Sequence, residues 1–340
     1  MAARVRAQGC PIQESRSFRA GAVTMTSAPV ATGEAGRGHV GLRRAFIVGC
    51  PRSGTTLLQA MLGRHPDVFT FPETHFFKKA WGRMWRFKQF GLAYPPAAAH
   101  AIAELRREVR LDGSGPVAPG FWPFFRTYGR WFTHIVDRAC REAGKSVWIE
   151  KSPIHLHCLP DIVRAVPAAR FVHVLRDGRE VVASFYELCL RDPTRWLGQV
   201  LAGDKQVYLR MEPHDGRILR AVIARWNRDV QISLHRRGDP AHHLVRYDRL
   251  IADPVATLRP VCAFLGIEFD DGMLEYWTSA PEVLGWRAQF EHMQKVLRPL
   301  DPQHGAKYVQ VLSAAQRAVV ESGLLDGGDL DALLGEGAPA

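Results

Sequence analysis

Short apolar runs alternate with stretches of helical periodicity along most of the chain. The first run begins at Phe46, breaks into a glycine-bounded loop and continues as an apolar-periodic segment rich in Thr and Leu. Short apolar runs bounded by turn residues predict buried strands. Four more such runs lie at residues 68–71, 147–150, 171–175 and around Leu244, Val245 and Tyr247. Strands that alternate with helices predict an α/β fold with a parallel sheet and helices on both faces.

Helical periodicity covers residues 56–64, 76–90, 98–110 and 121–142, with a Gly- and Pro-rich break at 112–120. The last of these segments is strongly aromatic. Its aromatic residues are Phe121, Trp122, Phe124, Phe125, Tyr128, Trp131 and Phe132. An aromatic stripe at helical spacing favours core packing. The alternative is a wall of a substrate site.

The loop after the first strand has the spacing of a phosphate-binding turn. Gly49, Gly54 and Thr56 occupy their places in the pattern G-x-x-x-x-G-K-[ST]. Thr55 stands where the lysine would be, and Arg52 lies inside the loop. Backbone amides near Gly54 can converge on one oxyanion at the positive end of the following helix. The spacing therefore predicts an anion site on a single-domain, P-loop NTPase-like fold; the alternative is an ordinary strand-to-helix turn.

Charged residues follow the ends of several predicted strands. Arg52, Glu73, Lys151 and Arg176 each fall at or just past such an end. Ligands of open α/β sheets bind outside the carboxyl ends of the strands. We therefore expect these four side chains to lie near one another.

Two separated motifs resemble the sulfotransferases that use 3′-phosphoadenosine 5′-phosphosulfate (PAPS). The first is PRSGTT at residues 51–56, and the second is RFVHVLRDGREVVASF, a strand that ends in R-D followed by a helix. The resemblance covers roughly residues 44–299. The stretch 50–74 is more similar to the tyrosylprotein branch and its bacterial relatives than to the cytosolic branch, which prefers lysine in the loop.

The resemblance implies which residues hold the cosubstrate. Arg52, Ser53, Gly54, Thr55 and Thr56 would bind the 5′-phosphosulfate. Arg176 and Ser184, eight residues apart, would hold the 3′-phosphate. Tyr247 resembles a residue near the adenine or 3′-phosphate side, with a buried strand tyrosine as the alternative. Arg298 is similar to a basic residue of a late loop that closes over the cosubstrate.

The resemblance also implies catalytic roles. Charge in sulfuryl transfer develops mainly on the departing phosphate oxygen, and Arg52 and Lys151 would neutralise it without a metal. Glu73, which lies 21 residues past Arg52, matches the general base of the tyrosylprotein branch. The alternative is a glutamate that caps a helix start. His75 and His155 are rival bases. A metal site at His155, His157 and Cys158 is disfavoured because the triplet has no distant partner.

Composition limits the partners and the location. The formal net charge of +11 and the pI near 9.7 suit a polyanionic ligand. Nucleic acid is disfavoured because the arginines are dispersed and no nucleic-acid-binding motif occurs. Six cysteines without a C-x-x-C pair, and no run long enough for a membrane span, predict a cytoplasmic protein. Residues 1–43 predict a disordered tail, with a transit peptide or a true start at Met25 as alternatives.

The sequence thus predicts a PAPS-dependent sulfotransferase domain at residues 44–335. It would release 3′,5′-ADP and sulfate a hydroxyl or amine of a small-molecule, carbohydrate, lipid or peptide acceptor. One alternative is a small-molecule kinase or other NTPase, which the loop spacing supports and the missing lysine opposes. The other is a non-catalytic nucleotide-binding protein on the same fold. The acceptor and the oligomeric state stay open.

Overall fold

The structure, a computed structural model, describes residues 41–81, 90–111, 124–193, 196–197, 216–285, 288, 291–301 and 307–335. These residues belong to one compact unit. The predicted tail lies outside the described residues as far as residue 40. Among the described helices, none is long and apolar enough to cross a membrane.

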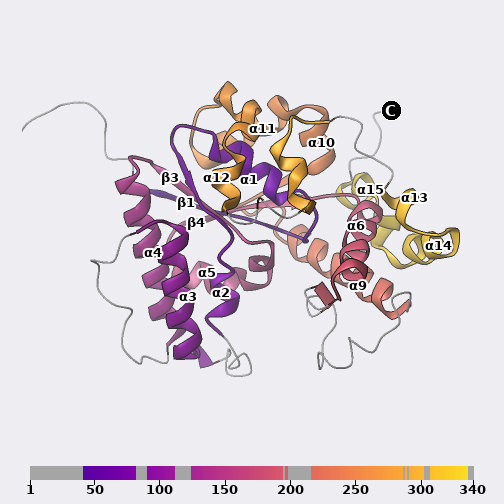
Figure 1. Ribbon diagram of the computed structural model, residues 1–340, viewed down its shortest axis with the longest axis horizontal. Helices are drawn as coiled ribbons and strands as arrows, with labels where there is room; N and C mark the ends of the chain where they lie inside the picture. Colours follow the sequence, from indigo (N-terminus) through magenta and orange to yellow (C-terminus); the bar gives the residue numbers. More distant parts are fainter. Residues whose placement is uncertain are drawn as a thin grey trace, which may run out of the picture. The chain divides into compact units, whose positions relative to one another are not determined.

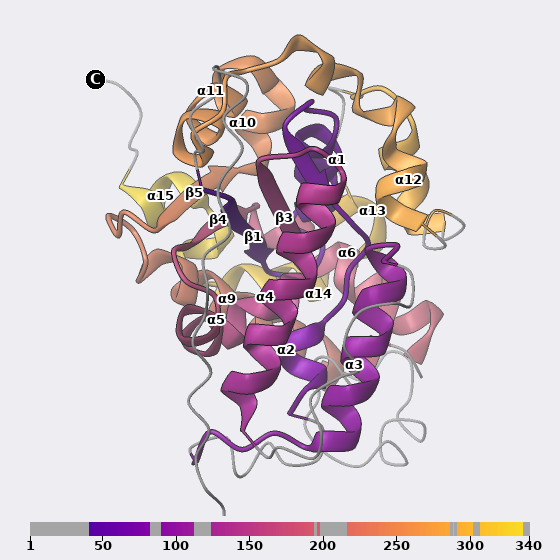
Figure 2. The same cartoon turned by 90° about the vertical axis from the view of Figure 1, so that its left-hand side faces the viewer.

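A five-stranded sheet forms the centre of this unit, and all of its strand pairs are parallel (Figures 1 and 2). The strand order is β2-β3-β1-β4-β5. The strands are β1 (Arg43–Gly49), β2 (Val68–Thr70), β3 (Val147–Lys151), β4 (Ala169–Leu175) and β5 (His242–Arg246). Each predicted strand is present, which confirms the α/β class. Because β1 pairs with β3 on one side and β4 on the other, the loop that follows β1 lies at the middle of the sheet's carboxyl edge.

Helices cover both faces of the sheet (Figure 1). The chain up to residue 191 contributes α1 (Thr55–Gly63), α2 (Phe76–Lys79), α3 (Pro95–Glu108), α4 (Phe125–Glu142), η2 (Pro153–Cys158), α5 (Leu159–Ala165) and α6 (Gly178–Arg191). The rest of the chain contributes α9 (Gly216–Leu234), α10 (Tyr247–Ala252), α11 (Pro254–Leu265), η3 (Asp271–Thr278), α12 (Ala280–Leu284), η5 (Glu291–Leu297), α13 (Lys307–Val311), α14 (Ala314–Gly323), η6 (Leu325–Gly328) and α15 (Leu330–Leu334).

Alternation along β1 explains how the two faces are filled. Phe46 and Val48 point to a core shared with α2 to α5, whereas Ala45 and Ile47 point to a core shared with α1, α10 and α11. A third core packs α6 and α9 against α14 and α15. A strand buried on both faces needs a continuous apolar run, which is the pattern at the start of β1.

The aromatic helix α4 confirms the core interpretation. Phe125, Tyr128 and Phe132 are buried, and the Phe132 ring stacks on Phe46 of β1 with centroids 6.1 Å apart. Removing a buried ring of this size costs about 3 to 5 kcal/mol of stability. Phe124, just before the helix, is exposed. The predicted start at residue 121 and the break at 112–120 lie outside the described residues.

Two predicted elements end earlier than expected. The helix predicted at 76–90 is present as α2 as far as Lys79, and the carbonyl of Ala80 accepts the amide of Tyr94; residues 82–89 lie outside the described residues. Strand β5 ends at Arg246, whose partner Leu175 is the last residue of β4. Tyr247 therefore begins α10, and the alternative of a strand tyrosine is wrong.

Candidate active site

The loop between β1 and α1 is shaped by two glycines. A Cβ at Gly49 would lie 2.6 Å from the carbonyl oxygen of Val174 on the neighbouring strand. A Cβ at Gly54, where φ is +95°, would lie 2.1 Å from the Tyr247 ring. Gly54 precedes α1, and no side chain caps this helix end. The first amides of α1 therefore keep their hydrogen-bonding capacity for a ligand.

A cavity of about 550 Å³ opens beside this helix end. Eight of the nine predicted cosubstrate residues line it: Arg52, Gly54, Thr55, Thr56, Arg176, Ser184, Tyr247 and Arg298. Ser53 is buried and does not line it; its amide donates to the carbonyl of Cys50. Six basic and three acidic residues are among the described residues that line the cavity, so its lining favours an anion.

Two arginines meet inside the cavity. Arg52 has a left-handed backbone (φ 77°), and its Nε donates to Ser184 Oγ over 3.2 Å. Arg176, just past β4, donates to the carbonyl of Arg52, and its guanidinium lies over the Tyr247 ring, 4.5 Å from the centroid. Burial, and then the charge of Arg176, lower the pKa of Arg52 to about 10. Two clustered cations of this kind are stabilised by a bound anion.

The late part of the chain closes another side of the cavity. Arg298 lines it, and the carbonyl of Arg298 accepts the Tyr276 hydroxyl over 2.7 Å. Lys295 and Lys307 also line it, and sequence reasoning missed both. Burial, and then Lys307 and Arg176, lower the pKa of Lys295. The only sequence signal for Lys295 is its place three residues before Arg298 in the segment KVLRPLD.

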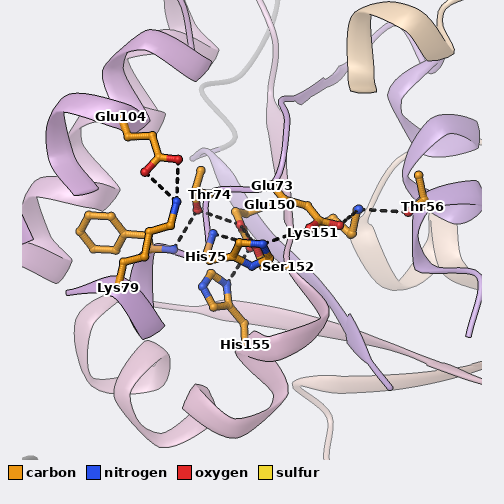
Figure 3. Close-up of polar contacts among 11 residues, drawn as sticks. Thr56, Glu73, Thr74, His75, Lys79, Glu104, Glu150, Lys151, Ser152 and His155 are labelled. Carbon is orange, nitrogen blue, oxygen red and sulfur yellow. Dashed lines mark hydrogen bonds and ion pairs between the residues drawn. The ribbon is translucent and has the colours of Figure 1, made fainter. Parts of the chain in front are cut away.

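Glu73 and Lys151 form an ion pair next to the cavity (Figure 3). Lys151 is the last residue of β3 and is fully buried, and Glu73 lies between β2 and α2 with 14% of its side chain exposed. Lys151 Nζ also donates to Thr56 Oγ1 over 3.1 Å. Because Thr56 lines the cavity, this lysine connects the anion loop to the glutamate.

His75 lies beside the same glutamate. Its Nε2 is 3.3 Å from Glu73 Oε2. Burial lowers the pKa of His75 to about 4, so the ring is neutral at pH 7.

His155, the other rival base, has both ring nitrogens engaged. Its Nδ1 donates to Glu150 Oε2 over 2.8 Å, and its Nε2 accepts the amide of Phe77 over 3.2 Å. The side chain has no exposed surface. The structure therefore removes His155 as a proton acceptor for a substrate.

The His155, His157 and Cys158 triplet does not converge. His157 Nε2 lies 2.7 Å from Asp229 Oδ1, whereas His155 contacts Glu150, and Cys158 is buried. No group of three potential ligands with a metal-binding arrangement occurs among the described residues. The described cysteines, from Cys50 onward, are all free thiols.

Comparisons with known proteins agree with this geometry. The model of the sulfotransferase family matches residues 44–271. Protein-tyrosine sulfotransferase 1 of Danio rerio is 26% identical over 79% of this chain and 64% of its own length. Protein-tyrosine sulfotransferase A of Caenorhabditis elegans is 26% identical over 68% of this chain and 52% of its own length. The chain thus spans about half to two thirds of the length of these relatives.

A solved structure shares the fold. The sulfotransferase domain of the Synechococcus PCC 7002 olefin synthase superposes with a TM-score of 0.51 and 22% identity, over 81% of this chain and 90% of that one. The family match includes the anion loop, both arginines, Glu73 and Lys151. The chain belongs to the sulfotransferase family.

Proposed function

We propose that the protein transfers a sulfuryl group from PAPS to a hydroxyl or amine of an acceptor and releases 3′,5′-ADP. The observation that carries the proposal is the convergence of Arg52, Arg176 and the uncapped start of α1 on one cavity, with the Glu73–Lys151 pair beside it. Membership of the sulfotransferase family supports it. The proposed catalytic domain comprises residues 44–335.

The cavity lining fits PAPS as a cosubstrate. We assign the 5′-phosphosulfate to the loop, where the amides near Gly54, the hydroxyls of Thr55 and Thr56, and Arg52 would bind it. Ser53 is buried beneath the lining and would stabilise the loop. Arg176 and Ser184 would hold the 3′-phosphate. Tyr247 and Arg298 would close the nucleotide side. The planar fork of Arg176, stacked on Tyr247, suits a phosphate better than an isolated lysine would.

The reaction needs few groups. PAPS supplies a sulfuryl group attached to a phosphate leaving group. Glu73 takes the proton of the acceptor as its oxygen or nitrogen bonds to sulfur. Lys151 and Arg52 stabilise the negative charge that remains on the 5′-phosphate oxygen when its bond to sulfur breaks. Because the transferred group carries a single charge, the proposal includes no metal.

The acceptor is a small molecule, a carbohydrate, a lipid or a peptide. Peptide tyrosine comes first for testing, because the relatives are named protein-tyrosine sulfotransferases. A cytoplasmic location stays a prediction of the cysteine pattern.

Calorimetry tests the donor. The protein should bind 3′,5′-ADP without magnesium and more tightly than ATP with magnesium, because Thr55 replaces the lysine that reads the β and γ phosphates. Arg176→Ala should weaken the binding of 3′,5′-ADP by about 2 to 5 kcal/mol and leave the binding of 5′-AMP nearly unchanged. Incubation with labelled PAPS and an acceptor panel, followed by mass analysis, should show an added sulfate. Magnesium-dependent binding of ATP that is tighter than that of 3′,5′-ADP would support a kinase instead.

A further inference from the structure

The segment that carries Glu73 has no regular structure of its own. Residues 71–75 join the end of β2 to the start of α2. His75, at the end of this segment, has a left-handed backbone with φ of 52°, which costs a non-glycine residue about 1 kcal/mol or more. The surrounding structure must therefore hold the segment in place.

Three side chains hold three consecutive amides at the end of this segment. The amide of His75 donates to Ser152 Oγ over 3.0 Å. The amide of Phe76 donates to Thr74 Oγ1 over 3.1 Å, and the amide of Phe77 donates to His155 Nε2 over 3.2 Å. These are the amides at the start of α2, which have no intrahelical partner.

All three side chains meet at one carboxylate, that of Glu150 (Figure 3). Thr74 Oγ1 donates to Glu150 Oε1 over 3.0 Å, and Ser152 Oγ donates to the same oxygen over 2.7 Å. His155 Nδ1 donates to Glu150 Oε2 over 2.8 Å. Each of the three groups thus donates to Glu150 and accepts one backbone amide.

The direction of every hydrogen bond follows from Glu150 being an anion. A carboxylate only accepts, so each hydroxyl must turn its proton toward Glu150 and its lone pairs toward an amide. Glu150 is fully buried. Burial raises its pKa, but the His155 side chain and the hydrogen bonds of Ser152 and Thr74 outweigh this and leave the pKa below its usual value.

Adjacent residues of β3 act on the same segment from opposite faces of the sheet. Glu150 fixes its backbone, whereas Lys151, the next residue, contacts the Glu73 side chain. We infer that Glu150 is a positioning residue: through Thr74, Ser152 and His155 it orients the backbone on which Glu73 accepts the acceptor's proton. This inference rests on the proposed function.

The first test is Glu150→Gln. The glutamine amide offers one acceptor oxygen and two N–H donors, so at least one of the three partners would face a donor and lose its orientation. We expect the turnover rate to fall about 10-fold to 100-fold, the effect of a misplaced catalytic group, with the 3′,5′-ADP affinity unchanged within about two-fold. Hydrogen exchange of the amides of residues 75–77 should become faster.

Asp137→Asn is the matched control. Asp137 is another buried carboxylate; its partners among the described residues, Arg44, Trp148 and Arg141, are not part of the site. The Asp137→Asn variant should be less stable than the wild-type protein, but its turnover should be unchanged, and hydrogen exchange of the amides of residues 75–77 should remain slow. Ser152→Ala, a smaller change, removes one connection and should reduce turnover several-fold.

A double variant separates positioning from a general structural role. Because Glu150 acts through Glu73, adding Glu150→Gln to Glu73→Gln should not slow turnover further. The inference is overturned if Glu150→Gln or Ser152→Ala turns over at the wild-type rate. It is also overturned if Glu150→Gln slows the Glu73→Gln variant by the same factor as it slows the wild-type protein. If the wild-type protein transfers no sulfuryl group, the proposed function itself fails, which is a different result.

Discussion

At the scale of single residues, Glu73 carries the most specific chemical prediction. Glu73→Gln keeps the size of the side chain but cannot accept a proton, so turnover should fall roughly 100-fold or more while 3′,5′-ADP binds as before. Single-turnover kinetics with labelled PAPS measures the effect. Glu104→Gln is the control, because Glu104 pairs with Lys79 outside the site and should keep full turnover. Normal turnover of Glu73→Gln would mean that another group is the base.

Sequence reasoning placed Arg52, Glu73, Lys151 and Arg176 correctly at one edge, because parallel strands bring their carboxyl ends together. It did not single out Glu150. An acidic residue at the end of an apolar strand is a visible signal. Its meaning depends on side chains from two other segments, which become neighbours only when β2 pairs with β3.

At the scale of elements, the start of α1 depends on Gly54. Gly54→Ala would place a methyl group in steric clash with the edge of the Tyr247 ring and strain a left-handed backbone. We expect 3′,5′-ADP affinity to fall about 10-fold or more, because Tyr247 and the first α1 amides would shift. Calorimetry and a melting curve measure the two effects.

Gly144→Ala separates strain from the clash. Gly144 has φ of +67° with open space around its Cβ position. This variant should lose about 1 kcal/mol of stability and bind 3′,5′-ADP normally. Equal losses of affinity in both variants would show that Tyr247 is not involved.

Element boundaries were less predictable than element types. The 76–90 pattern is helical in period, yet α2 is only four residues long, and just past it the carbonyl of Ala80 accepts the amide of the distant Tyr94. Likewise, β5 ends where its partner β4 ends, which local sequence cannot reveal. Lys295 and Lys307 were missed because their segments reach the cavity only through tertiary packing.

At the scale of the whole molecule, a buried histidine pair predicts acid sensitivity. His173 of β4 is fully buried between Ser233 and His242, with contacts of 3.0 and 2.8 Å. Burial, and then His242, lower the pKa of His173 to about 3. The pKa of this histidine in the unfolded chain is about 6.5. Above that pH the buried neutral ring of His173 makes its full contribution to the free energy of unfolding, and this contribution is lost as the pH falls toward 3. The loss by pH 4 should reach about 3 kcal/mol.

Denaturant unfolding at several pH values measures this contribution. His173→Gln removes the titrating ring and should flatten the decline between pH 6.5 and pH 4. The exposed His235 provides the control, since His235→Gln should leave the decline unchanged. An equally steep decline in His173→Gln would assign the acid sensitivity to other groups.

The strand order has a consequence for how the protein acquires its site. The central strand β1 pairs only with strands on the order of a hundred residues away in the chain, so closing these pairs is slow compared with forming helices. The anion loop, Lys151 and Arg176 come together only once β1, β3 and β4 have paired. Recovery of 3′,5′-ADP binding during refolding would then report completion of the sheet, and a nascent chain that ends before β4 would have no nucleotide site.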